Sequence, residues 1–252
     1  MRQTRSIARS AAGFRSVQLI ERDRNWGLAE SVIAGVSEAC AEQGKVIVLE
    51  DDLLVAPQFL TFLNRGLDHF AEDTRVFQVS GYMFPVATDE TLHGLFLPVI
   101  SCWGWGTWQR AWTQFDRSAA GYVALERDPV LRMRFNLGGH YEYFGMLKDQ
   151  VEGRIDSWAV RWLLSVFLKD GLVLYPRKSL VQNAGVDGTG THGRGASSLQ
   201  SALRVESQAF GRERCWPGAI DVDAAVLDRV KTLLSSSSRS HPIVGFIRRL
   251  LR

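Results

Sequence analysis

The sequence predicts an α/β fold in which a largely parallel sheet is flanked by helices. Short continuous apolar runs, such as residues 46–49, have the length and composition of strands buried inside parallel sheets. These runs alternate with longer segments, such as residues 29–41, in which apolar side chains recur at helical spacing. Alternating strands and helices in a chain of 252 residues predict one such domain, with enough sequence left for a smaller lobe.

Two kinds of local signal set the expected elements. Helices are predicted where apolar residues share one face, at 29–41, 59–70 and 157–169. Gly44 and Gly171 follow the first and the last of these helices as expected C-terminal caps. Strands are predicted from short apolar runs at 17–20, 46–49, 75–80, 95–100, 172–175 and 179–183. Pro98 makes the fourth run an edge strand or an irregular one, because proline cannot donate to a sheet ladder.

Composition narrows the class of protein. Hydrophobic residues make up 46% of the chain and charged residues 23%, as in ordinary folded domains. The net charge is only +3, and no basic helix is interleaved with aromatic residues, so we expect no nucleic-acid partner. Cys40, Cys102 and Cys215 form no C-x-x-C pair, and no 18-residue apolar stretch or secretion signal is found. These features predict a cytoplasmic protein.

Three parts are expected along the chain. Residues 1–16 are rich in arginine, serine and alanine and predict a basic arm, either partly helical or loose. Residues 17–234 hold the main domain, and residues 235–252 begin with four serines that predict a linker. The tail beyond the serines mixes apolar residues with arginine. Its open interpretations are a basic amphipathic helix at the surface of the inner membrane, a helix docked on the core, and a frayed end.

The most informative segment is a cluster of carboxylates. Glu50, Asp51 and Asp52 directly follow the apolar run 46–49, where exposed like charges repel one another. A bound divalent cation, Mn²⁺ or Mg²⁺, accounts for such a cluster and would bridge it to a diphosphate. The alternative is a solvated strand end near a helix N-terminus, where the helix dipole favours negative charge.

A second segment is dense in tryptophan and glycine. Trp103, Trp105 and Trp108 are separated by Gly104 and Gly106. Indole rings on a backbone that a ligand can approach closely predict a platform on which a sugar ring stacks. The alternative interpretation is the aromatic core of a second lobe.

Two single residues complete the set of candidates. Asp156 directly precedes the helix expected at 157–169, so it is either the N-cap of that helix or a general base that faces a cleft. His192 lies in a loop of glycine and threonine, where a histidine is either a surface residue or a metal ligand delivered by a closing loop.

Taken together, these segments resemble nucleotide-diphospho-sugar glycosyltransferases of the GT-A fold, especially bacterial family-2-like enzymes and the N-acetylglucosaminyltransferase I type. Residues 46–59 are similar to the family's metal-binding segment, an apolar strand followed by Glu-Asp-Asp, proline and an aromatic residue. Residues 103–112 resemble its glycine–tryptophan loop on the acceptor side, residues 156–162 its next block and residues 188–192 its closing loop. The resemblance implies a Rossmann-like domain with a smaller acceptor-side lobe.

The resemblance also implies a role for each matched residue. Asp52 would be the chief metal ligand, with Asp51 and Glu50 at the nucleotide ribose or in the metal shell. Asp156 would be the catalytic base, and His192 a third metal ligand or a diphosphate contact.

The start of the chain departs from the family pattern. The family's Asn-x-Gly turn, on the nucleotide-sugar side, matches Asn25 and Gly27, but two strands normally precede it. The resemblance therefore implies a GT-A domain truncated at its N-terminus, without its first nucleotide-binding strand and uridine-binding loop.

The function implied is metal-dependent, inverting transfer of a sugar from a nucleoside-diphosphate donor to a glycan or lipid-linked acceptor in bacterial surface polysaccharide synthesis. Two other classes stay open. One is a non-catalytic remnant that binds a partner protein, and the other is a metal-dependent phosphohydrolase, because aspartate pairs hold Mg²⁺ there too.

Overall fold

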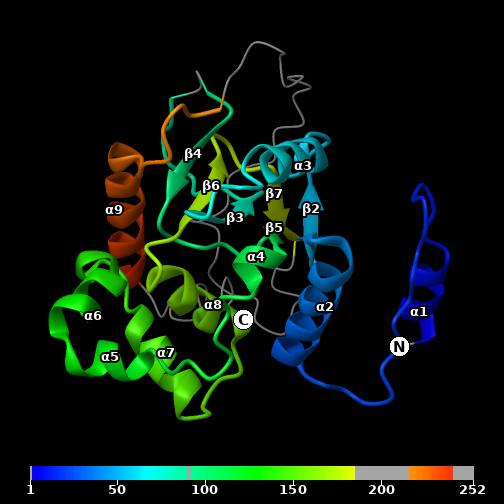
Figure 1. Ribbon diagram of the computed structural model, residues 1–252, viewed down its shortest axis with the longest axis horizontal. Helices are drawn as coiled ribbons and strands as arrows, with labels where there is room; N and C mark the ends of the chain where they lie inside the picture. Colours follow the sequence, from blue (N-terminus) through cyan, green and yellow to red (C-terminus); the bar gives the residue numbers. More distant parts are fainter. Residues whose placement is uncertain (1, 90–91, 185–215, 241–252) are drawn as a thin grey trace.

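The computed structural model of the chain describes residues 2–89, 92–184 and 216–240 (Figure 1). At its centre lies a five-stranded sheet with the strand order β1-β5-β3-β6-β4. Its strands are β1 (Lys45–Val48), β3 (Val76–Ser80), β4 (Gly94–Leu97), β5 (Trp105–Trp108) and β6 (Leu172–Pro176). A separate two-stranded antiparallel ribbon pairs β2 (Leu53–Val55) with β7 (Val181–Asn183). The predicted α/β class is confirmed.

The prediction of a largely parallel sheet is wrong. Only β3 and β6 run parallel, and every other neighbouring pair in the five-stranded sheet is antiparallel. The main cause is β5, which forms from the tryptophan–glycine segment and inserts between β1 and β3, antiparallel to both. The segment was not predicted as a strand, because glycine is rare in strands and the three tryptophans were interpreted as a sugar-binding platform or as the core of a second lobe.

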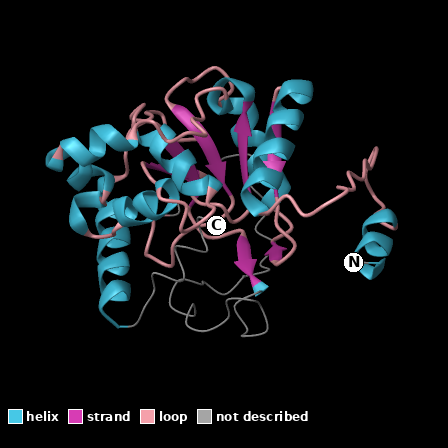
Figure 2. Ribbon diagram, turned by 90° about the horizontal axis from the view of Figure 1, so that it is seen from below, coloured by secondary structure: helices cyan, strands magenta, loops and turns pink. Residues whose placement is uncertain are grey.

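Helices surround this sheet (Figure 2). They are α1 (Arg2–Arg9), α2 (Leu28–Gln43), α3 (Phe59–His69), α4 (Gln109–Trp112), α5 (Tyr122–Arg127), α6 (Pro129–Phe135), α7 (Tyr143–Val151), α8 (Trp158–Phe167) and α9 (Ala224–Ser240), with a short 3₁₀ helix at Leu137–Gly139. The three helices predicted from apolar periodicity correspond to α2, α3 and α8. In Figure 1, α5, α6 and α7 gather near α9, and α1 stands apart from the rest of the molecule.

The ends of α2 follow the sequence signals. Its buried face carries Ala29, Ile33, Val36 and Cys40, which recur every three to four residues. The helix ends at Gly44, whose φ of 74° lies in the left-handed region and whose N–H donates to the carbonyl of Cys40. This cap turns the chain directly into β1.

The strand expected at 17–20 does not form. Val17, Leu19 and Ile20 are exposed, and the segment contains neither helix nor strand. An extended segment without a neighbouring strand has no ladder hydrogen bonds to hold it. The basic arm is partly helical, because α1 occupies residues 2–9.

The serine linker expected from residue 235 is also corrected. The helix α9 continues through these serines to Ser240. Val226, Val230 and Leu234 are buried at successive four-residue steps, so packing of this stripe offsets the weak helix preference of the serines. Residues 241–252, which carry the predicted amphipathic tail, lie outside the described residues. In the described part of the chain, no helix combines the length and the apolar character that crossing a membrane requires.

The strand β1 lies at one end of the sheet. Its inner edge pairs with β5 from Lys45 to Val48. Across residues 2–89, 92–184 and 216–240, no strand pairs with its outer edge. The carboxylate cluster follows this edge strand directly.

Candidate functional site

The carboxylates at the end of β1 crowd one another. Glu50, Asp51 and Asp52 form the turn that leads from β1 into β2, with Asp51 exposed and the other two partly buried. Burial, together with the negative charges of Asp52 and Asp51, raises the pKa of Glu50 to about 7. This turn is therefore a place where a positive ion is favoured.

The two carboxylate oxygens of Asp52 differ in their hydrogen bonds. Its Oδ2 accepts from Nδ2 of Asn183 at 3.1 Å, and its backbone carbonyl accepts from the N–H of Ala184 at 2.7 Å. Its Oδ1 is buried and, among the described residues, finds no donor. A buried carboxylate oxygen without a donor is costly, and a hard divalent cation is the partner that such an oxygen suits.

The carboxylate cluster suits a divalent cation that takes only some of its coordinating oxygens from the protein. Within the described residues, no three side chains of His, Cys, Asp and Glu converge in metal-binding geometry. Mg²⁺ commonly uses one or two carboxylates and completes its shell with water and substrate phosphates. Asp52 and its neighbour Asp51 suit that arrangement, whereas His192, the third predicted ligand, lies outside the described residues.

A chain of contacts brings Asp156 to the same end of the sheet. Val48, the last residue of β1, pairs with Trp105, the first residue of β5. The ring of Trp105 stacks on that of Trp158, with centroids 5.1 Å apart and planes inclined by 20°. Trp158 opens α8, two residues after Asp156. Through this stack, the strand pair beside the acidic turn contacts the first residue of α8, two residues after Asp156.

Asp156 is not the N-cap of α8. The cap is Ser157, whose hydroxyl accepts from the N–H of Val160 at 3.3 Å. The side chain of Asp156 remains 63% exposed and forms an ion pair with Arg161, whose Nη2 lies 3.5 Å from Oδ1. The N-cap alternative is therefore wrong, and the exposed carboxylate is paired with Arg161 instead of the helix backbone.

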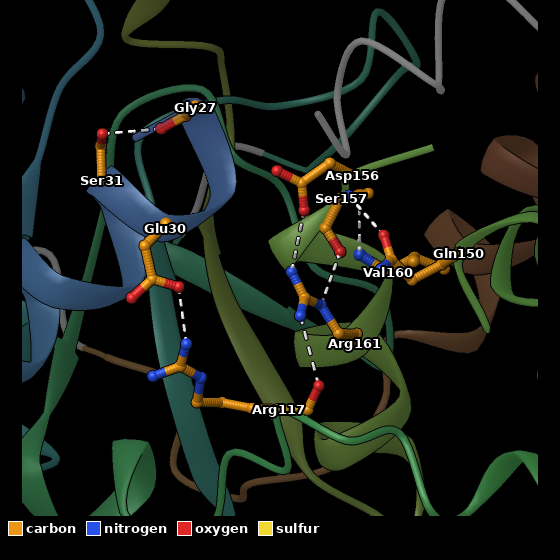
Figure 3. A network of polar contacts seen from close by, with 9 residues as sticks. All are labelled: Gly27, Glu30, Ser31, Arg117, Gln150, Asp156, Ser157, Val160 and Arg161. Atoms are coloured by element: carbon orange, nitrogen blue, oxygen red, sulfur yellow. Dashed lines mark hydrogen bonds and ion pairs between the residues drawn. The ribbon is translucent and has the colours of Figure 1, made fainter. Parts of the chain in front are cut away.

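The Asn25–Gly27 turn lies beside Asp156 (Figure 3). Oδ1 of Asn25 accepts from the N–H of Gly27 at 2.8 Å, which closes the turn before α2. Gly27 has a φ of 80°, and a Cβ there would stand 3.4 Å from Oδ2 of Asp156. Sequence reasoning placed this turn on the nucleotide-sugar side; the structure brings it to the predicted base.

The prediction that three tryptophans form a sugar-binding platform is wrong. Trp103, Trp105 and Trp108 are only 2%, 0% and 4% exposed, so a sugar ring cannot stack on them. Their neighbours are other aromatic side chains and strand backbone, and Nε1 of Trp108 donates to the carbonyl of Leu67 at 2.8 Å. The three tryptophans belong to an aromatic core, as the alternative interpretation held, but this core is that of the central sheet and not of a second lobe.

Gly104 and Gly106 serve the same core rather than a ligand. A Cβ on Gly104 would lie 2.8 Å from Phe59 and 3.0 Å from Val181. A Cβ on Gly106 would lie 3.0 Å from the carbonyl of Val46. Their lack of a side chain lets helix and strands approach β5 closely.

Sequence reasoning missed two residues that hold the predicted ones in place. Asn183 ends a predicted strand, and only the pairing of β7 with β2 brings its amide to Asp52. Arg161 stands five residues after Asp156, a spacing that carries no signal until the helix start is known.

An apolar cavity of about 460 Å³ lies near the other end of α8. Phe135, Leu163, Phe167 and Leu227 are among its lining residues, and none of the predicted site residues lines it. Its lining surface is mostly apolar, although Arg134, Asp170 and Lys231 also line it, and it holds none of the carboxylates predicted to bind a metal.

Comparison with protein-family models and with curated proteins finds no match to this chain.

Proposed function

We propose that the chain is a metal-dependent, inverting glycosyltransferase that uses a nucleoside-diphosphate sugar and a hydroxyl acceptor. The observation that carries the proposal is the buried Oδ1 of Asp52 after β1, which finds no hydrogen-bond donor among residues 2–89, 92–184 and 216–240. The second support is the contact chain from Val48 through Trp105 to Trp158, which relates this oxygen to the exposed carboxylate of Asp156.

Each residue has a separate task in the proposed reaction. Asp52, with Asp51 beside it, holds Mn²⁺ or Mg²⁺ through hard carboxylate oxygens. When bound, the cation supplies positive charge that stabilises the departing nucleoside diphosphate. Asp156 takes the proton from the acceptor hydroxyl, whose oxygen attacks the anomeric carbon from the face opposite the leaving group.

Calorimetric titration with UDP and with GDP, each in the presence of Mn²⁺, tests the part of the proposal that concerns metal and nucleotide binding. We expect binding by the wild-type chain and an affinity lower by more than about tenfold in Asp52→Asn. Asp170→Asn is the matched control, because this aspartate is 82% exposed and pairs with Arg134 away from the cluster. Absence of binding heat in the wild-type chain would instead favour a non-catalytic, partner-binding domain.

Transfer assays with a panel of UDP- and GDP-hexoses test the proposed role of Asp156 as the base that takes the proton of the acceptor hydroxyl. Asp156→Asn should lower kcat by about 100-fold or more and leave binding of UDP with Mn²⁺ unchanged, since only proton removal is lost. Normal turnover by this variant would show that Asp156 is not the base. Release of phosphate without an acceptor would favour the phosphohydrolase class.

A further inference from the structure

A largely buried guanidinium lies against the predicted base. The side chain of Arg161 is 12% exposed, and its nitrogens are used in three directions (Figure 3). Its Nε donates to the carbonyl of Ser157 at 3.0 Å, and its Nη1 donates to the carbonyl of Arg117 at 3.2 Å. Its Nη2 points at Oδ1 of Asp156. Two backbone contacts thus fix the guanidinium before it meets the carboxylate.

The neighbouring charges favour an ion pair between Arg161 and Asp156. Burial lowers the pKa of Arg161, and the negative charge of Asp156 opposes that effect. The neighbouring cation, Arg117, has its own partner, because its Nη2 lies 2.6 Å from Oε2 of Glu30 on α2. The pair of Arg161 and Asp156 therefore forms one unit, and the pair of Arg117 and Glu30 forms another.

Asp156 is confined from the opposite side as well. Its Oδ2 faces Gly27, where only hydrogen occupies the place of a side chain. The carboxylate lies between a fixed guanidinium at Oδ1 and the start of α2 at Oδ2. An aspartate that is 63% exposed would otherwise rotate among several rotamers.

We propose that Arg161 is the positioning residue of Asp156, holding its carboxylate toward Gly27 in the orientation that takes a proton from the acceptor hydroxyl. The inference rests on the proposed function, because it assigns a task to Arg161 within that reaction. A general base must lie within hydrogen-bond reach of its proton, and misplacement by about 1 Å can cost about 100-fold in rate.

The test compares Arg161→Met, Arg161→Lys and Arg117→Met with the wild-type chain. We expect kcat to fall by about 100-fold in Arg161→Met while KM for the nucleotide sugar stays within about twofold, because donor binding does not use Asp156. Arg161→Lys restores part of the rate, since lysine keeps the charge but not the planar fork. Arg117→Met, which keeps the carbonyl that Arg161 uses, retains the wild-type rate.

Crystal structures of the same variants give a readout that does not depend on turnover. Asp156 should keep one rotamer facing Gly27 in the wild-type chain and in Arg117→Met, and should leave it in Arg161→Met. The inference is overturned if Arg161→Met keeps both the rotamer and kcat, or if kcat and KM change together with a lowered Tm. Failure of the wild-type chain to bind UDP with Mn²⁺ would overturn the proposed function instead, and the rotamer comparison would still report on Arg161.

Discussion

The orientation of Asp52 depends on one amide. Asn183 holds Oδ2 at 3.1 Å, which leaves Oδ1 as the oxygen available to a cation. We expect Asn183→Leu to weaken binding of UDP with Mn²⁺ by about tenfold, as loss of an outer-shell partner of a metal ligand does. Calorimetric titration measures the change.

The control for this prediction is Gln182→Leu. Gln182 is the preceding residue of β7, and alternation along a strand directs its side chain to the other face of the ribbon. An equal loss of affinity in both variants would mean that the ribbon as a whole, rather than the Asn183 amide, supports the site.

The raised pKa of Glu50 predicts that the free energy of unfolding of chelator-treated protein falls as the pH rises. Burial and two neighbouring aspartates raise its pKa from 4.5 to about 7 in the folded chain. Between these values the folded state binds the proton that the unfolded state has released, so raising the pH lowers the free energy of unfolding. The loss is on the order of 3 kcal/mol between pH 4.5 and pH 7.

Urea unfolding in EDTA at pH 5 and pH 7.5 measures this loss, and Glu50→Gln should remove most of it. Glu38→Gln, at an exposed position of α2, should leave the pH dependence as it is. A wild-type chain that gains stability over this interval would contradict the assignment.

At the scale of elements, close packing around β5 decides which glycines are required. Gly104 and Gly44 both have positive φ, at 60° and 74°. A Cβ on Gly104 meets Phe59 at 2.8 Å, whereas a Cβ on Gly44 meets nothing within 4 Å. Both alanine variants pay for backbone strain, but only Gly104→Ala also overpacks the core.

We expect the free energy of unfolding to fall further in Gly104→Ala than in Gly44→Ala, by about 1 to 3 kcal/mol. Denaturant titration of both variants measures the difference. Equal losses would mean that Phe59 moves aside without cost and that the strand is less tightly packed than its contacts indicate.

The elements that the sequence predicted are those whose signals are local. The apolar run of β1 and the periodic face of α2 each contain their own pattern, and Gly44 marks the boundary between them. The strand β5 lacks such a signal, because its hydrogen bonds come from β1 and β3, distant in sequence. The sheet is mixed and not largely parallel as predicted, because this long-range pairing of β5 has no local signal in the sequence.

The residues of the candidate site also fall into two groups, those with a local sequence signal and those that depend on contacts made after folding. Asp52 and Asp156 were identifiable because a carboxylate after a buried strand, or before a helix, is visible in the sequence. Asn183 and Arg161 act only through contacts made after folding. The indole rings were misassigned because a tryptophan that stacks on a sugar and one that fills a core have the same composition.

At the scale of the whole molecule, one contact relates the acidic turn to the start of α8. The stack of Trp105 on Trp158 is buried and connects β5 with that helix. Trp158→Leu should lower the free energy of unfolding by about 3 kcal/mol, because the smaller side chain leaves a cavity. It should also lower kcat more than nucleotide affinity, since Asp156 lies two residues before α8 and pairs with Arg161 on that helix. Phe14→Leu, at an aromatic residue 69% exposed, is the control, and denaturant titration with steady-state kinetics measures both effects.

The same stack belongs to a row of four indoles. Successive ring centroids lie 5.1 Å apart from Trp158 to Trp105, 6.1 Å from there to Trp112, and 5.1 Å from Trp112 to Trp162. Chromophores this close share their excited states, which splits an ultraviolet absorption band into circular dichroism lobes of opposite sign. The circular dichroism of the chain therefore reports how β5, α4 and α8 are oriented relative to one another, and it can be recorded without label, donor or metal.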